Sequence, residues 1–100
     1  MRIEKTGYQG DLSLKVIGRL DTVTAPQLED MLKSSLAGVS HLTMDFSSLE
    51  YISSAGLRVL LSAHKTMKQQ EGAMAVQGAN EEVREVFTVT GFDKILTVED

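Results

Sequence analysis

DFSSLEYISSAGLRVLL, residues 45–61, changes its hydrophobic period part-way along. The first residues alternate between apolar and polar side chains, whereas Leu57, Leu60, Leu61 and His64 follow helical spacing, so we predict a strand, a loop and the start of a helix. The first N–H groups of a helix lack intrahelical partners and carry the positive end of its dipole. A serine in this loop, at 53 or 54, could therefore cap the helix, bind a phosphate or carry one.

Length and composition narrow the class of protein. The chain has 100 residues, of which 42% are apolar and 24% charged, which predicts one folded domain over residues 1–100. The net charge is -4 and the basic residues are scattered, which argues against a nucleic-acid partner. No apolar run approaches the roughly 20 residues that span a bilayer, and Met1–Lys5 does not begin a signal peptide. We expect a cytoplasmic monomer with no membrane partner.

Strands and helices alternate along the rest of the chain. We predict strands at 3–8, 12–20, 41–46, 73–77 and 94–98. The predicted helices run from a Thr24 cap to near Gly38, from Ala55 to Gln70 with Gly72 just beyond, and from an Asn80 cap to Gly91. This β-β-α-β-α-β-α-β order predicts an α/β fold, with a mixed, mostly parallel sheet, an antiparallel N-terminal hairpin and packed helices. Periodicity does not decide whether helices cover one face of the sheet or both.

The residues give little support to an enzyme. Neither loop serine follows a glycine at the spacing of G-x-S-x-G, and the two common nucleotide fingerprints are absent. The chain has no cysteine, and its two histidines are too few for a structural zinc site. Asp21, Asp45 and Glu50 could converge on Mg²⁺, although solvated charges and caps explain them as well. We expect no catalytic residue, no metal and no cofactor; a small Mg²⁺-dependent phosphoryl-transfer enzyme built on Asp21, Asp45 and Ser54 remains as an alternative.

The order and spacing of short motifs resemble a known bacterial family, the anti-sigma factor antagonists, which are small STAS-domain proteins. The resemblance covers nearly the whole chain and is therefore more specific than any one motif. The residues that carry it are GRLD at 18–21, TA at 24–25, DFS at 45–47, YISSAGL at 51–57, Gly72, VF at 86–87 and GF at 91–92.

The resemblance implies a regulatory role in partner switching. In the family, the unmodified antagonist binds an ATP-dependent serine kinase that is also an anti-sigma factor, which frees a sigma factor for transcription. Phosphorylation of one serine reverses this, and a serine phosphatase is a further expected partner. The family motif places the acceptor at Ser54, with Ser53 as a weaker candidate that stands where many members carry aspartate. The implied partner-binding residues are Asp21, Ser53, Ser54, Ala55, Gly56 and Leu57.

A second role is compatible with the same resemblance. STAS domains also serve as constitutive scaffolds or interaction subunits of transporters and signalling complexes. In that role the serine loop would only cap its helix, and a phosphate would control nothing. The residue chemistry of the loop, taken without the family, favours this capping role, which is worth about 1 kcal/mol.

Overall fold

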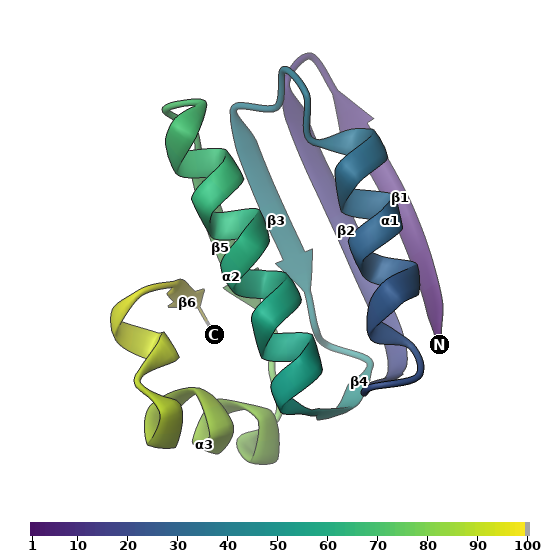
Figure 1. Cartoon of the computed structure of the whole chain (residues 1–100), viewed down its shortest axis with the longest axis vertical. Helices are drawn as coiled ribbons and strands as arrows, with labels where there is room; N and C mark the ends of the chain where they lie inside the picture. Colours follow the sequence, from purple (N-terminus) through teal and green to yellow (C-terminus); the bar gives the residue numbers. More distant parts are fainter. Residues whose placement is uncertain (100) are drawn as a thin grey trace.

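A six-stranded sheet carries two long helices on one face, as Figure 1 shows. The computed structural model describes residues 1–99. Its elements in chain order are β1 (Arg2–Tyr8), β2 (Asp11–Leu20), α1 (Ala25–Ser35), β3 (His41–Asp45), β4 (Leu49–Ile52), α2 (Ser54–Gln69), β5 (Ala73–Gln77), α3 (Glu81–Thr90), the 3-10 turn η1 (Phe92–Lys94) and β6 (Thr97–Glu99).

The sheet is mixed and mostly parallel, which confirms the predicted fold class. Its strand order is β1-β2-β3-β5-β6, and β4 pairs separately with the end of β2. The β1–β2 pair is antiparallel, and the β2–β3, β3–β5, β5–β6 and β2–β4 pairs are parallel. The hairpin turns through Gln9 and Gly10, with φ values of 48° and 90°. Two successive positive φ values are those of a type I′ turn, the tight connection that suits the twist of paired strands.

The structure corrects two predicted boundaries. Residues 49–52, predicted as part of a loop, form strand β4, which pairs with Gly18, Arg19 and Leu20. The last strand, predicted at 94–98, begins only at Thr97, because residues 92–94 form the 3-10 turn. The full order therefore contains one strand more than the sequence indicated, placed immediately before α2.

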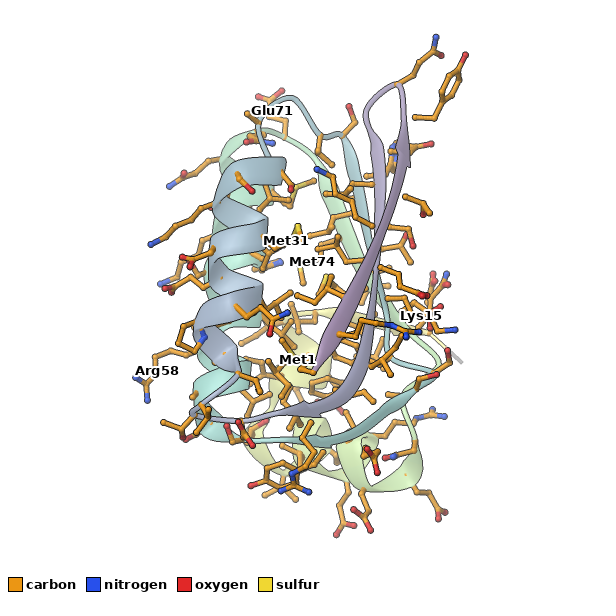
Figure 2. The ribbon with its side chains drawn as sticks, turned by 90° about the vertical axis from the view of Figure 1, so that its right-hand side faces the viewer. Met1, Lys15, Met31, Arg58, Glu71 and Met74 are labelled. Carbon is orange, nitrogen blue, oxygen red and sulfur yellow. The ribbon has the colours of Figure 1, made fainter. Side chains whose placement is uncertain are left out.

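The helices α1 and α2 cover the same face of the sheet. Leu12, Leu14 and Val16 of β2 are buried beneath them, whereas the alternate residues Ser13 and Lys15 are only half-buried. Figure 2 shows the helix layer on one side of the strands and Lys15 on the other. The hydrophobic core thus lies between one sheet face and two helices, and the opposite face remains open in the part of the chain that is described.

The shorter helix α3 closes the end of the sheet where the serine loop lies. The Asn80 side chain accepts a hydrogen bond from the Val83 N–H at 2.9 Å and donates one to the Leu49 carbonyl at 3.1 Å, so it caps α3 and ties it to β4. Phe87 of α3 stacks on Phe46, with 6.4 Å between the ring centroids. The predicted Asn80 cap is confirmed.

Candidate functional site

The serine loop lies beside the end of β2. The Ser53 N–H donates to the Leu20 carbonyl at 2.9 Å, and the Gly18 N–H donates to the Ser48 carbonyl at 3.1 Å. Both bonds join the segment around β4 to the last residues of β2. Since Asp21 directly follows Leu20, the structure brings residues 18–21 and the serine loop to one edge of the molecule. In parallel sheets the loops that follow the carboxyl ends of strands commonly share such an edge.

The two serines have different surroundings. Ser53 is the N-cap of α2: its backbone is extended, its hydroxyl accepts from the Gly56 N–H at 3.5 Å, and its carbonyl accepts from the Leu57 N–H at 3.0 Å. Ser54 is the first residue of the helix and is exposed. Within residues 1–99 its hydroxyl makes no hydrogen bond. The capping role therefore falls to Ser53, and the Ser54 hydroxyl is left accessible to solvent.

Gly56 and Leu57 lie behind the surface. A Cβ atom on Gly56 would stand 2.7 Å from Leu20 Cγ and 2.9 Å from Ile52 Cγ1, so α2 approaches the two strands more closely than any other residue would allow. Leu57 is also buried, whereas Ala55 is half-buried. Of the implied partner-binding residues, these two therefore position the loop and Ala55 reaches its surface.

Asp21 organises the turn that precedes α1. Its carboxylate accepts from the Val23 and Thr24 N–H groups, each at 3.0 Å, and the Thr24 hydroxyl oxygen lies 3.1 Å from it. The backbone N–H of Thr24 is the chief cause that lowers the pKa of Asp21, which keeps this carboxyl ionised. Thr24 occupies the predicted N-cap position of α1, but its side chain makes no capping hydrogen bond to the helix. Its backbone is already helical and its hydroxyl donates back to the Arg19 carbonyl at 2.8 Å.

Arg19 and Tyr51 form a second surface feature on this edge that sequence reasoning missed. They face one another across the β2–β4 pair, and the Arg19 guanidinium lies 4.3 Å from the Tyr51 ring centroid. Arg19 Nε also lies 3.9 Å from Asp21 Oδ2. The contact joins the serine loop segment to the Asp21 turn. It could have been found only from the pairing of β2 with β4.

Two of the carboxylates considered for Mg²⁺, Asp21 and Asp45, accept hydrogen bonds from their own turns instead. Asp45 accepts from the Ser47 N–H at 2.9 Å, and hydrogen bonds from Ser47, through its side chain first and its backbone second, lower the pKa of Asp45. Across the described residues 1–99, no three His, Asp or Glu side chains gather in a way that could hold a metal ion. The magnesium alternative therefore gains no geometric support.

None of the helices found between residues 1 and 99 has both the length and the apolar character needed to cross a membrane.

Comparison with known proteins identifies relatives over the whole chain. The model of the STAS domain family matches residues 2–100. BtrV of Bordetella bronchiseptica, provisionally classed as an anti-sigma factor antagonist, is 34% identical over 98% of this chain and 85% of its own. The solved structure of an anti-sigma factor antagonist from Mycobacterium paratuberculosis is 26% identical, covers 98% of this chain and 84% of its own, and has a TM-score of 0.88.

Two more distant structures share the fold alone. The phosphorylated form of SpoIIAA, a Bacillus cell fate determinant, has a TM-score of 0.77 and 15% identity over 97% of this chain and 90% of its own. A sulfate transporter family protein from Wolinella succinogenes has a TM-score of 0.81 and 15% identity over 96% of this chain and 81% of its own. The same fold therefore occurs both in a cell fate determinant and in a protein of the sulfate transporter family.

Proposed function

The chain belongs to the STAS-domain family of anti-sigma factor antagonists, and from this we propose that it is a partner switch controlled by phosphorylation of Ser54. Unmodified, it binds an ATP-dependent serine kinase that is also an anti-sigma factor, and a sigma factor is released in the cytoplasm. The Ser54 Oγ then attacks the γ-phosphorus of ATP; a phosphate ester forms, ADP leaves, and the hydroxyl proton passes to a base of the kinase. A serine phosphatase restores the free hydroxyl by hydrolysis.

One observation carries the choice of Ser54. The two adjacent serines divide their tasks, because Ser53 caps α2 and Ser54 is exposed at the first helical position with a hydroxyl that has no partner among residues 1–99. A kinase could therefore reach the Ser54 hydroxyl without opening the fold. Modification of Ser53 would instead remove a helix cap. The contrast between the two serines and the alignment with the family motif therefore favour the same acceptor, Ser54.

The position of Ser54 also predicts how the phosphate would act. A phosphoserine adds about -1.5 to -2 charges at pH 7, and the start of a helix favours negative charge. The protein should therefore fold equally well with and without the phosphate, and the effect falls on the partner. An interface that accepts a neutral hydroxyl meets a dianion, with like-charge and desolvation costs. A loss of 2.8 kcal/mol would weaken binding by about a hundredfold.

The experiment is phosphate transfer with the cognate kinase and ATP. We expect mass spectrometry to place one phosphate on Ser54, Ser54→Ala to abolish its uptake, and Ser53→Ala to retain it. The Ser53→Ala variant is the matched control, since it removes the neighbouring hydroxyl and leaves the acceptor. Unchanged phosphate uptake in Ser54→Ala would refute the assignment.

A constitutive scaffold within a transporter or signalling complex is the second candidate. The observation that favours it is Ser53, which stands where many family members carry aspartate beside the acceptor. Pull-down with wild type and Ser54→Asp separates the two. Loss of an ATP-binding partner in Ser54→Asp supports the switch, whereas an unchanged set of partners supports the scaffold.

A further inference from the structure

Helix α2 is cationic in an acidic protein. The chain has 14 acidic residues and a net charge of -4, yet none of these acids lies in α2. Arg58, Lys65 and Lys68 of this helix are all exposed. At 100° per residue they share the side of α2 that faces away from its buried residues Leu60 and Ala63. We call these three cations the α2 basic stripe.

The charges of the α2 basic stripe are not neutralised within the molecule. Elsewhere Arg2, Arg19 and Lys33 make ion pairs, the last with Glu29 of the neighbouring helix α1 at 3.7 Å. In the described residues, no carboxylate lies within 4.0 Å of a charged group of the stripe. Figure 2 shows Arg58 projecting from the helix layer, on the side of the molecule opposite Lys15. The stripe therefore presents unpaired positive charge to whatever approaches α2.

Ser54 lies on the same line. It precedes Arg58 by four residues, and residues spaced by four are neighbours on a helix surface. A phosphate on Ser54 would consequently place negative charge at one end of the stripe. It would offset the nearest cation and would repel any anionic group that the stripe attracts. The stripe and the acceptor thus form one surface whose charge phosphorylation can lower.

We propose that the α2 basic stripe docks an acidic surface of the protein partner that the Ser54 switch controls. This inference rests on the proposed function and adds the chemistry of the partner: carboxylate side chains arranged opposite Arg58, Lys65 and Lys68. It also gives a direct reason why phosphorylation weakens the complex, because the phosphate meets those carboxylates. Rim charges of this kind mainly raise the association rate and make binding depend on salt.

Two other occupants fit the observations less well. An anionic membrane would attract the cations, but stable attachment requires an inserted apolar face, and the apolar face of α2 is buried against the sheet. A second copy could offer its α3, which carries Glu81, Glu82 and Glu85. A closed dimer would need this contact to form twice, with α2 and α3 of each copy meeting reciprocally. Both are treated as outcomes of the test.

The test compares two charge-reversed pairs. Lys65→Glu with Lys68→Glu reverses the stripe, and Lys5→Glu with Lys15→Glu, on strands β1 and β2, makes the same change in net charge elsewhere. Affinity for the kinase that phosphorylates Ser54 is measured by titration at low and high salt. We expect the stripe pair to lower affinity by about tenfold or more at low salt, with the difference shrinking at about 0.5 M salt, and the control pair to stay within about twofold of wild type.

The outcomes separate this inference from the proposed function. If wild type binds the kinase and is released by phosphorylation while the stripe pair behaves like the control pair, the inference fails and the switch stands. If wild type binds no kinase, both fail. If the stripe pair instead abolishes binding to vesicles of anionic phospholipid, or self-association, while kinase affinity is unchanged, the stripe has another occupant and the inference is overturned. If the variant that carries Lys65→Glu and Lys68→Glu does not fold, the milder single change Arg58→Gln replaces it in the same titration.

Discussion

Replacing Gly56 by alanine sets two effects of opposite sign against each other. Alanine is the better helix former, by about 1 kcal/mol in a helix interior. Against this, the added Cβ would stand 2.7 Å from Leu20 Cγ and 2.9 Å from Ile52 Cγ1. Both partners are buried side chains of β2 and β4, with 0% and 3% of their surface exposed, so neither can swing out into solvent. The sign of the stability change therefore reports which effect dominates.

We expect packing to dominate. Extra methyl groups in a well-packed core typically cost about 1–3 kcal/mol, and two contacts with buried strand residues place Gly56→Ala in the upper part of that range. After the gain in helix propensity, the net loss should be about 1–2 kcal/mol. For a domain of this size, each kcal/mol lowers the melting temperature by about 4–8 °C. Thermal and urea unfolding followed by circular dichroism measure both quantities. A Gly56→Ala variant that melts at or above the wild-type temperature would refute the reasoning.

A double-mutant cycle provides the control. Leu20→Ala removes the Cγ atom that the new methyl group would contact most closely. In that background Gly56→Ala should cost less than in wild type, or should stabilise the protein. An equal cost in both backgrounds would mean that the contact with Leu20 is not the cause.

Three further predictions concern stability. Glu71 follows α2 with φ of 59°, a strained conformation for a side-chain-bearing residue, so Glu71→Gly should stabilise the protein by about 1 kcal/mol in a thermal melt. Asn80→Ala should cost about 1–2 kcal/mol in urea unfolding, and Asn80→Asp less, because aspartate keeps the cap and loses only the bond to Leu49. Folding lowers the pKa values of Asp21 and Asp45. The two carboxylates therefore stabilise the fold fully above the unfolded-state pKa of about 3.9, and this stabilisation is lost as the pH falls through the folded-state pKa. The urea concentration at the unfolding midpoint should therefore decrease as the pH is lowered below about 4. It should decrease less steeply in the double variant Asp21→Asn with Asp45→Asn.

The sequence alone predicted an element correctly where one hydrophobic period or one characteristic residue type marks that element. Strand β2 alternates buried and half-buried residues over most of its length, and α3 begins at an asparagine cap and ends at Gly91 with φ of 80°. These signals depend on residues close together in the sequence, and the elements that they predict are found in the folded protein. Together they determined the α/β class and the mixed sheet.

Strand β4 could not be predicted in the same way. It has only four residues, with Leu49 and Ile52 buried and the two between them exposed, so it shows no alternation. Its register with β2 shifts between Gly18 and Arg19. A strand defined by irregular pairing leaves no period in the sequence. The Arg19–Tyr51 contact, which depends on that pairing, was missed for the same reason.

Gly72 follows α2 for a reason that the sequence does not reveal. Gly72 was predicted to follow α2, and it does, but Glu71 is the residue with positive φ. Glycine is required at 72 for space, since a Cβ there would lie 2.7 Å from Met67 Cε and 2.8 Å from the Ser40 carbonyl oxygen. Two reasons for a glycine, backbone conformation and close packing, look the same in a sequence. Only the fold distinguishes them.

The same distinction between structural and free groups defines the candidate site. The Asp21 carboxylate is occupied by its own turn, and the Ser53 hydroxyl caps α2. Gly56 is fixed by the approach of the helix to β2 and β4. Among residues 1–99, none of the bonds that hold this edge together uses the hydroxyl of Ser54. A charge added there can therefore change what the surface attracts while every contact that maintains the surface persists, which is the property that a reversible switch requires.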